Sequence, residues 1–334
     1  MTRCLIIAEA GVNHNGDTAL AKELIEVAAA AGADAVKFQT FRAELLASPD
    51  LAKAPYQQGD GHSAESQREM LARLELDEAA HRELMEHACE HGVELLSTPF
   101  DIPSIDLLDR LGLQRFKIPS GEITNTPYLR HLGRLGKPLI LSTGMATLGE
   151  IERALEILTR AGTPRKRITL LHATSAYPTP MAEVNLRAMQ TLGTTFGLRY
   201  GYSDHTRGIE VPIAAVALGA CVIEKHFTLD RNLPGPDHAA SLEPDELAAM
   251  VRAIRNIEIA LGSAVKQPTA SETANRPLVR KRIVAATTIR PGEPFSAANL
   301  TTRRAPAGLC ASRWDELTGR RAEREYRTGE GIEP

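Results

Sequence analysis

The 334-residue sequence is poor in cysteine and in net charge. Only Cys4, Cys89, Cys221 and Cys310 occur, and without a C-x-x-C pair they disfavour a disulfide framework or a zinc-finger site. Their mostly apolar neighbours predict buried, reduced thiols. The formal net charge of −3 provides no basic field for nucleic acid or an anionic membrane, so an anionic substrate needs a local cluster of donors.

The sequence also lacks a long apolar run. No stretch approaches the ~18 residues of a membrane span. The first residues pass from a short apolar run directly into AEAGVNHNG, which indicates a strand and its loop rather than a signal peptide. We therefore expect a mature chain that begins at Met1 and stays in the cytoplasm. No GxSxG motif occurs, which disfavours a serine hydrolase.

What the sequence does contain is a repeated alternation of short apolar runs and longer segments with helical spacing. Eight strands are predicted: Cys4–Glu9, Ala35–Gln39, Val93–Thr98, Arg115–Ile118, Leu139–Ser142, Ile168–His172, Gly197–Tyr202 and Cys221–His226. Helices are predicted at Thr18–Ala31, Ile105–Leu111 (with Ser104 as its N-cap), Leu148–Arg160 and Pro244–Leu261. The alternation predicts an α/β fold of the (β/α)8 TIM-barrel type. A doubly wound open sheet is the alternative, weakened by the missing GxGxxG loop.

Two breaks interrupt this pattern. The polar segment Arg42–Asp77 is interpreted as a loop beside the active face. The Gly-, Ser-, Thr- and Pro-containing segment after Leu261 is typical of a linker. We therefore divide the chain into a barrel domain (1–262), a linker (263–280) and a small β-rich domain (281–334), with strands at Arg282–Thr288 and Asn299–Arg304. A tail of this size is marginally stable alone, so we expect it to dock on a partner surface.

Polar residues stand at the end of almost every predicted strand. They are Glu9, Lys37, Gln39, Thr98, Lys117, Ser120, Glu122, Ser142, His172, Ser175, Tyr177, Ser203, Asp204, His205, Lys225 and His226. Taken singly, such a residue is more often a helix cap or a structural hydrogen-bonding group. In a barrel, however, all strand ends meet at one rim, where chemistry takes place. Lysines and hydroxyls gathered there predict a site for a small, highly charged anion.

His205 and His226 end consecutive predicted strands. Neighbouring parallel strands lie ~4.8 Å apart, so both imidazoles could reach one catalytic divalent metal ion. Glu122 and Asp237 are carboxylates on the same rim that could ligate, orient sugar hydroxyls or transfer protons. Asp237 lies in a Pro/Gly-rich loop that could fold over the rim. For NHNG at 13–16, loop geometry and a functional role remain equally open.

The motifs IIAEAGVNHNGD, ADAVKFQTF, STPFD, FKIPSGEITN, LSTGMATLGEI, HATSAYPTP, GYSDHTRGI and EKHFTLDRNLPGPDHAAS occur in this order. With them the chain resembles the bacterial N-acetylneuraminate (sialic acid) synthases, including the legionaminic acid synthases. The tail NRPLVRKRIVAATTIRPGEPFSAANLTTRR resembles their C-terminal antifreeze-like (SAF) domain. The resemblance covers essentially the whole chain.

The resemblance implies an enzyme that condenses phosphoenolpyruvate with N-acetylmannosamine to form N-acetylneuraminate and phosphate. The alternative acceptor is 2,4-diacetamido-2,4,6-trideoxymannose. It further implies a divalent metal ion, with Mn²⁺ first and Mg²⁺ or Co²⁺ possible, held by His205 and His226. The implied phosphoenolpyruvate site consists of Lys37, Thr98, Lys117, Ser120, Ser142, Ser175, Tyr177 and Ser203.

On the acceptor side, the resemblance implies that Glu9, Gln39 and Asp237 face the amino sugar. It also implies a domain-swapped homodimer in which Arg304 reaches the partner's site. We expect Lys37 and Lys117 to position the donor and Glu122 to manage protons. Three rivals stay open: a Schiff-base aldolase using Lys117 or Lys37, a non-catalytic sugar-binding protein, and condensation with arabinose 5-phosphate or erythrose 4-phosphate.

Overall fold

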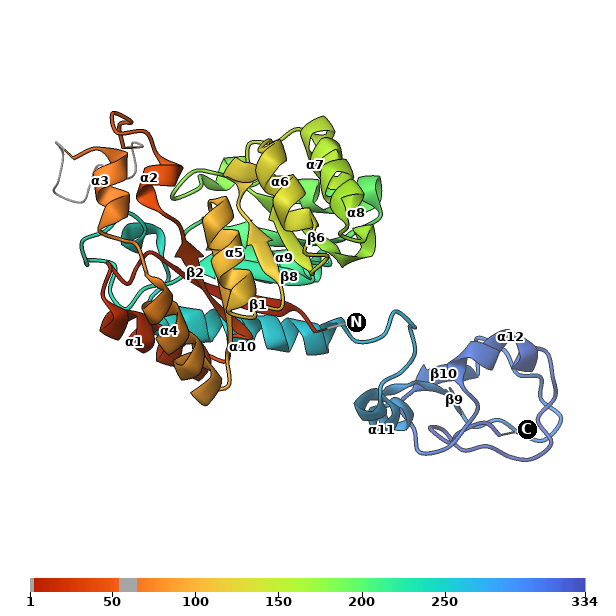
Figure 1. Cartoon of the computed structure of the whole chain (residues 1–334). Helices are drawn as coiled ribbons and strands as arrows, with labels where there is room; N and C mark the ends of the chain where they lie inside the picture. The colour runs from red at the N-terminus through yellow and green to blue at the C-terminus, as the bar shows by residue number, and fades with distance from the viewer. Residues whose placement is uncertain (1–2, 54–64, 334) are drawn as a thin grey trace. The chain divides into compact units, whose positions relative to one another are not determined.

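The computed structural model describes residues 3–53 and 65–333, which group into two compact units. The first unit is Met1–Gly262 and the second is Ser263–Pro334. Figure 1 shows strands surrounded by helices in the first unit, and a helix followed by short strands at the start of the second.

Eight parallel strands form the sheet of the first unit. They are β1 (Leu5–Gly11), β2 (Ala35–Thr40), β3 (Glu94–Pro99), β4 (Phe116–Ile118), β5 (Leu139–Ser142), β6 (Ile168–Ala173), β7 (Arg199–Asp204) and β8 (Val222–His226). The order is β3-β2-β1-β8-β7-β6-β5-β4, and β3 and β4 at its two ends also contact each other. Because the two end strands β3 and β4 contact each other, the sheet closes on itself, which excludes the open, doubly wound alternative. The predicted barrel and its eight strands are confirmed, with bounds shifted by at most two residues.

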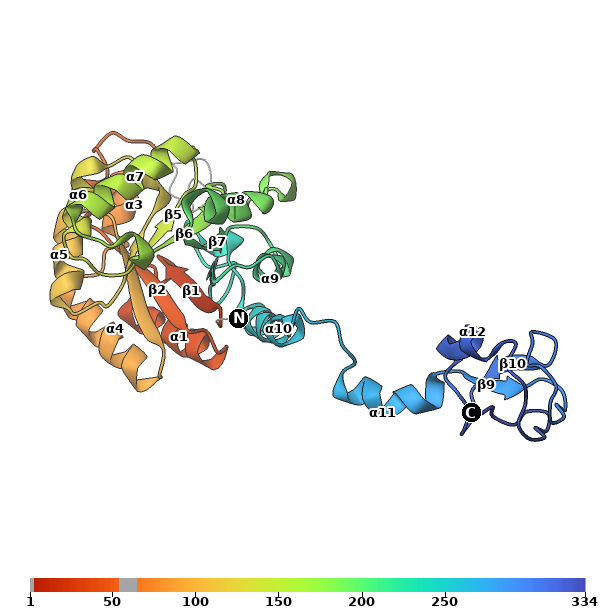
Figure 2. The same cartoon turned by 90° about the vertical axis from the view of Figure 1, so that its right-hand side faces the viewer.

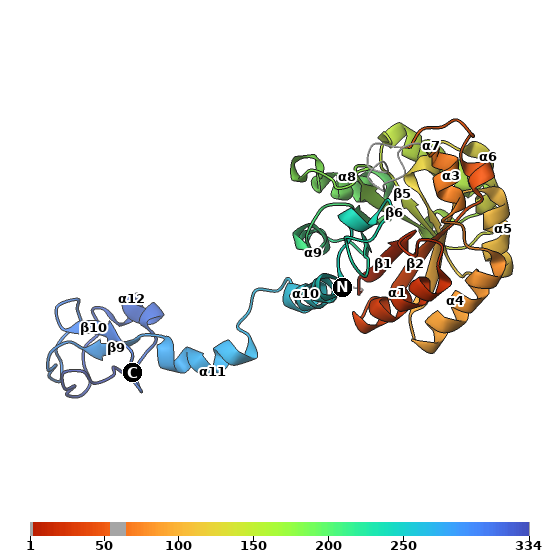
Figure 3. The same cartoon turned by 90° about the vertical axis from the view of Figure 1, so that its left-hand side faces the viewer.

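Helices surround these strands, as the two rotated views show (Figures 2 and 3). They are α1 (Thr18–Ala30), α4 (Glu78–Glu90), α5 (Ile102–Arg110), α6 (Thr126–Gly133), α7 (Leu148–Ala161), α8 (Arg187–Phe196), α9 (Glu210–Ala217) and α10 (Pro244–Leu261). The N-cap of α5 is Asp101, whose carboxylate accepts a hydrogen bond from the Ser104 N–H at 2.7 Å. The prediction of Ser104 as the N-cap is therefore wrong, because a carboxylate three residues earlier takes that position.

Side chains along the strands point alternately into the barrel and out toward the helices. A buried apolar layer fills the barrel with Ile7, Ala35, Leu96, Ile140, Leu171 and Val222. Two residues further along five of these strands, the inward side chains are Glu9, Lys37, Thr98, Ser142 and Glu224. The apolar layer therefore forms the floor of a polar chamber at the carboxyl ends of the strands.

The same alternation turns three predicted rim residues outward. Lys225 Nζ lies 2.6 Å from Asp204 Oδ2, and this fully buried ion pair lies on the outer face of the sheet. His172 contacts the carbonyl oxygen of Val184 through Nε2 at 2.8 Å. The predictions that placed Asp204, Lys225 and His172 on the rim are wrong, because each follows or precedes an inward residue by one position.

The segment between β2 and α4 is more structured than the predicted loop. It contains α2 (Ala43–Leu46) and α3 (Gln67–Ala72), while part of it, residues 54–64, lies outside the described residues. Helix α3 begins with a capping box between Ser66 and Glu69. Both helices pack into one apolar cluster that also contains Val12 and Phe41.

The second unit contains α11 (Ala270–Val279), β9 (Arg282–Ala285), β10 (Leu300–Arg303) and α12 (Trp314–Leu317). Strands β9 and β10 pair in antiparallel fashion and cover a small apolar core that includes Ile283, Ile289 and Phe295. The predicted linker is partly helical, because Thr269 and Glu272 form a capping box that begins α11. Both predicted strands are present but shorter.

All four cysteines are free, yet only Cys4 is buried, so the prediction of burial is wrong for the others. Cys89 is exposed because it lies on the outer face of α4. Among the helices that the structure describes, none is long and apolar enough to cross a membrane.

Candidate active site

A network of buried charges lies directly above the apolar layer. Lys37 Nζ lies 2.7 Å from Glu9 Oε2 and donates a hydrogen bond to Thr98 Oγ1 at 2.7 Å. Lys117 Nζ donates to Glu224 Oε1 at 2.9 Å, and the same oxygen lies 3.9 Å from Lys37 Nζ. Glu224 of β8 therefore bridges two lysines that come from β2 and β4.

The electrostatics of this network favour a bound anion. Burial raises the pKa of Glu224, but the ammonium groups of Lys117 and Lys37 outweigh it and lower that pKa to about 2. Burial raises the pKa of Glu9 to about 7, against the opposing charge of Lys37. Two lysine side chains thus face one carboxylate that stays ionised and a second carboxyl that is partly protonated near neutral pH, and this balance favours a bound anion.

Hydroxyl groups line the neighbouring part of the chamber. Ser203 donates to the bridging glutamate at 3.0 Å, and the buried Ser142 Oγ has no partner among the described residues. Ser120 Oγ accepts a hydrogen bond from the Gly144 N–H at 2.9 Å. A Cβ at Gly144 would lie 2.5 Å from Ser175 Oγ, so only glycine lets these two hydroxyls approach. Such a group of donors suits phosphate or carboxylate oxygens.

His205 and His226 face each other at the ends of β7 and β8. Their ring centroids are 5.6 Å apart, as the sequence predicted for residues of neighbouring strands. His205 Nδ1 donates to the Thr174 carbonyl oxygen at 2.7 Å, which leaves Nε2 as a lone-pair donor. His226 Nδ1 is buried without a hydrogen bond and lies 3.8 Å from Asp237 Oδ2.

Both imidazoles are in the form that binds metal ions. Burial lowers the pKa of His205 to about 4. Burial and the neighbouring His205 imidazole lower the pKa of His226 well below its usual value. Two neutral imidazoles beside a carboxylate, with room for other ligands, fit a catalytic divalent cation. A surface group of possible ligand atoms within 4.8 Å of one another, on α1 and α4, consists of Glu26, His87 and His91.

The loop that carries Asp237 is held by the segment 13–16. Asn13 Nδ2 donates to the Phe227 carbonyl oxygen at 2.8 Å and to Ser241 Oγ at 3.0 Å. Ser241 Oγ in turn donates to the Asp237 carbonyl oxygen at 2.7 Å. The NHNG motif, whose role the sequence left open, therefore connects the end of β1 to the loop after β8.

One cavity of about 430 Å³ brings nearly all predicted site residues together. The predicted residues that line it are Glu9, Lys37, Gln39, Thr98, Lys117, Ser120, Ser142, Ser175, Tyr177, Ser203, His205, His226 and Asp237. Sequence reasoning missed Glu224, which also lines it. The signal was available, because Glu224 precedes His226 by two positions on one strand and so shares its face.

Besides the three residues that face outward, two residues with predicted roles are not among those that line this cavity. Glu122 ends the short 3-10 helix Ser120–Glu122 and is not among the lining residues; its carboxylate accepts a hydrogen bond from Asn125 Nδ2. Burial raises the pKa of Glu122. Arg304 belongs to the second unit and follows β10. The roles assigned to Glu122 and Arg304 therefore stay predictions.

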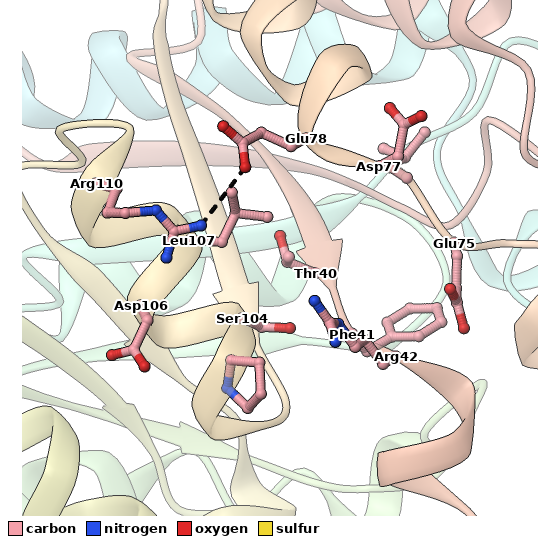
Figure 4. A pocket seen from close by; sticks show the side chains of 12 residues that line it. Thr40, Phe41, Arg42, Glu75, Asp77, Glu78, Ser104, Asp106, Leu107 and Arg110 are labelled. Carbon is pink, nitrogen blue, oxygen red and sulfur yellow. Dashed lines mark hydrogen bonds and ion pairs between the residues drawn. The ribbon is translucent and has the colours of Figure 1, made fainter.

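A second cavity, of about 360 Å³, contains none of the predicted site residues. It lies beside the end of β2 and is lined mainly by residues of the α3–α4 connection and of α5 (Figure 4). Glu78 and Arg110 form an ion pair of 3.5 Å across it. Its mixed charges do not converge on one ligand type, whereas the first cavity concentrates two lysines, hydroxyls and histidines.

Fold and site together define an α/β barrel whose cavity brings two buried lysines and a facing pair of histidines to the carboxyl ends of the strands. The chain belongs to the NeuB family, which it matches over residues 24–266, and it matches the SAF domain over residues 280–334. The resemblance stated from the motifs is thereby confirmed.

Similar proteins agree with this assignment. The chain is 56% identical to an N,N'-diacetyllegionaminic acid synthase of Campylobacter jejuni over 99% of both chains. It is 48% identical to the enzyme of the same name from Legionella pneumophila, over 98% of this chain and 92% of the other. The crystal structure of a sialic acid synthetase from Leptospira borgpetersenii in complex with citrate is 37% identical, with a TM-score of 0.72 over 82% of this chain and 90% of that one. This chain is a phosphoenolpyruvate-condensing synthase of the N-acetylneuraminate synthase type.

Proposed function

We propose that this synthase condenses phosphoenolpyruvate with 2,4-diacetamido-2,4,6-trideoxymannose to form N,N'-diacetyllegionaminate and phosphate. The full-length similarity to two N,N'-diacetyllegionaminic acid synthases carries this choice. The sequence analysis ranked N-acetylmannosamine first, and the comparisons favour the alternative instead. N-acetylmannosamine differs at C4 and C6 only, so it remains a useful test substrate.

The donor end of the cavity suits phosphoenolpyruvate, which carries a phosphate and a carboxylate. Lys37 and Lys117 would neutralise and position these groups, with Thr98, Ser120, Ser142, Ser175, Tyr177 and Ser203 as further contacts. Two observations support this assignment: the Ser142 hydroxyl has no partner among the described residues, and the Ser120 and Ser175 hydroxyls both lie against Gly144. Fixing the donor in this way lowers the barrier through positioning.

His205 and His226 would hold a divalent cation, most simply Mn²⁺, beside Asp237. When bound, such an ion acts as a Lewis acid toward the aldehyde of the open-chain sugar. The lone-pair geometry of His205 and the unpartnered His226 Nδ1 support this role. Glu9, Gln39 and Asp237 would bind the sugar, and burial raises the pKa of Asp237 to about 6.

The bond changes follow from the two substrates. C3 of phosphoenolpyruvate attacks the aldehyde carbon, water adds at C2, and the tetrahedral carbon expels phosphate by C–O cleavage. Lys37 and Lys117 hold the donor throughout and stabilise the negative charge of the leaving phosphate. The pKa of Glu9 near 7 lets this carboxyl exchange protons with the sugar hydroxyls at neutral pH. Glu122 remains our candidate for handling protons of the attacking water.

We also infer a cytoplasmic, domain-swapped homodimer in which Arg304 completes the partner's cavity. Helix α11 buries none of its side chains, and Leu278 and Val279 are 71% and 51% exposed. Apolar side chains exposed on one short helix support docking on another copy of the chain.

The direct experiment measures phosphate release from phosphoenolpyruvate with Mn²⁺ and each candidate sugar. We expect faster turnover with the diacetamido sugar, and loss of activity after chelation. His205→Ala and His226→Ala should lose activity with the fold intact, whereas His131→Ala on α6 should retain it. No turnover with any six-carbon mannosamine derivative, or metal-dependent turnover in both histidine variants, would contradict the proposal.

The same assay separates the rivals. A Schiff-base aldolase would survive chelation, would release no phosphate and would be trapped by borohydride with its carbonyl substrate. Lys37 pairs with Glu9 and Lys117 pairs with Glu224, and an amine held by a carboxylate is poorly placed to attack a carbonyl, which disfavours that chemistry. A non-catalytic sugar-binding protein would turn over neither substrate, and a sugar-phosphate synthase would require arabinose 5-phosphate or erythrose 4-phosphate.

A further inference from the structure

One side of the active-site cavity is apolar. We call this side the apolar wall, and it consists of Val12, Leu46, Met70, Leu71, Leu74 and Phe100. Leu46 ends α2, while Met70, Leu71 and Leu74 lie on or just after α3. The wall is therefore built mainly by the segment between β2 and α4, which interrupts the regular barrel pattern.

The apolar wall adjoins the acceptor part of the cavity. Val12 and Phe100 directly follow β1 and β3, whereas most of the donor hydroxyls come from or follow β4 to β7. At Gly11, next to Val12, an added Cβ would lie 3.4 Å from Asp237 Oδ2 and 3.5 Å from Gln39 Nε2. The wall thus begins where the residues assigned to the sugar lie.

The two candidate acceptors differ in the groups that would meet such a surface. N-acetylmannosamine carries a hydroxyl at C4 and a hydroxymethyl group at C6. The alternative carries an acetamido group at C4 and a methyl group at C6, so two methyl groups replace hydroxyls at its periphery. A hydroxyl placed against an apolar surface loses its hydrogen bonds to water, whereas a methyl group gains from burial.

We propose that the apolar wall is the specificity element of this enzyme, which selects a 6-deoxy, 4-acetamido sugar over N-acetylmannosamine. This inference rests on the proposed function, because it assigns the acceptor to the cavity beside Glu9, Gln39 and Asp237. Gln67, at the start of α3, also lines the cavity and contributes an amide group to the same side. A wall of methyl and thioether groups with one amide matches acetamido and methyl substituents better than free hydroxyls.

The competing explanation is that these side chains only attach α3 to the barrel. Met70 is 1% exposed and belongs to one apolar cluster with Phe41 and Ala47, which do not line the cavity. Packing alone predicts that polar substitutions here slow both sugars equally. Selection predicts that they change the ratio of kcat/KM for the two sugars. This ratio does not depend on the fraction of folded enzyme.

The test uses full-length Met70→Gln and Leu46→Asn, with Ala47→Ser as the matched control in the same cluster. The measurement is kcat/KM for each sugar with Mn²⁺ and saturating phosphoenolpyruvate, together with KM for phosphoenolpyruvate. One methylene in an apolar pocket changes kcat/KM by roughly 10- to 200-fold. We therefore expect kcat/KM for the diacetamido sugar, divided by kcat/KM for N-acetylmannosamine, to fall at least about tenfold in both variants. In Ala47→Ser this ratio should equal that of the wild type, and the KM for phosphoenolpyruvate should stay unchanged in all three variants.

Leu46 is half-buried, so Leu46→Asn keeps the test valid if Met70→Gln fails to fold. A ratio equal to that of the wild type in the folded variants would overturn the inference while leaving the proposed function intact. Absence of phosphate release by the wild-type enzyme with either sugar would instead remove the proposed function, and the inference with it.

Discussion

Glu224 lies on the last barrel strand, 107 residues after Lys117, and contacts both Lys117 and Lys37. Its carboxylate is buried, its pKa is about 2, and both ammonium groups lie within 4 Å of one of its oxygens. A buried ammonium group without a counter-charge is strongly destabilising. Glu224 therefore pairs with both lysine side chains and holds them in place until the substrate anion arrives.

Replacing this carboxylate without changing its shape separates stability from binding. We expect Glu224→Gln to lower the free energy of unfolding by about 3–5 kcal/mol, because two buried ammonium groups then share only Glu9. Added phosphoenolpyruvate should raise Tm more in the variant than in the wild type, since the ligand restores the missing negative charge. Glu94→Gln, which removes a partly exposed ion pair with Arg115, should change stability by less than about 1 kcal/mol.

The buried His14 predicts a pH dependence of stability. Burial lowers its pKa to about 4 from 6.5, so between these values the unfolded chain binds a proton that the folded chain does not. Stability is therefore full above pH 6.5 and falls as the pH drops toward 4. In urea unfolding, His14→Asn should flatten this slope relative to the wild type, and His91→Gln on the surface should not. An unchanged slope in His14→Asn would contradict the assignment.

At the scale of elements, loops rather than strands decide which residues can meet the sugar. The loop 230–241 carries Asp237, and Asn13 attaches this loop through the Phe227 carbonyl and the Ser241 hydroxyl. The segment between β2 and α4 supplies the apolar wall. Both connections cover the barrel, whose strands pair with one another without any contribution from these connections.

Asn13→Ala should loosen the loop that carries Asp237. Loss of two buried hydrogen bonds costs about 1–3 kcal/mol of stability. We expect KM for the sugar to rise several-fold while KM for phosphoenolpyruvate stays constant, because Asp237 is assigned to the acceptor only. Asn232→Ala is the control, since Asn232 lies in the same loop and, among the described residues, its hydrogen bonds go to Asp230. Equal changes in both KM values would indicate a general effect on folding instead.

Helix α11 shows why the sequence predicted no helix within the linker. It contains Ser271, Thr273 and Pro277, which on propensity disfavour a helix. The capping box at Thr269 and Glu272 begins the helix despite this composition. Capping interactions join specific positions, so a count of linker-type residues does not detect them.

At the scale of the whole molecule, the predicted domain swap is testable by subunit mixing. His205→Ala removes the chemistry of one cavity, and Arg304→Ala removes the arm that is predicted to serve the partner's cavity. Each variant alone should be nearly inactive. After subunit exchange, a swapped heterodimer contains one cavity with both wild-type parts, so the mixture should regain about a quarter of wild-type activity.

The control for this mixing is Arg303→Ala, the neighbouring residue, which should remain active alone. Activity that stays at the level of the separate variants after verified exchange would mean that Arg304 acts within its own chain or not at all. Light scattering on the wild type would establish the dimer independently of activity.

Most of the barrel followed from the sequence because its signals are local. Short apolar runs with helical segments between them gave all eight strands to within two residues. The site was predicted less completely, because neighbouring residues of a strand point to opposite faces. An error of one position therefore moves a side chain from the inside of the barrel to its outer face. Thus His205 and His226 face the cavity as predicted, whereas Asp204 and Lys225, which directly precede them, face outward, and Glu224 was overlooked.

The sequence by itself determined the barrel, the tail and most of the polar rim, because periodicity and motif order are properties of neighbouring residues. Only the tertiary structure decided that Glu224 joins Lys37 to Lys117, that Asn13 holds the Asp237 loop, and that α3 gives the cavity an apolar wall. These contacts join residues far apart in the chain, and their existence depends on barrel closure, which no local pattern contains.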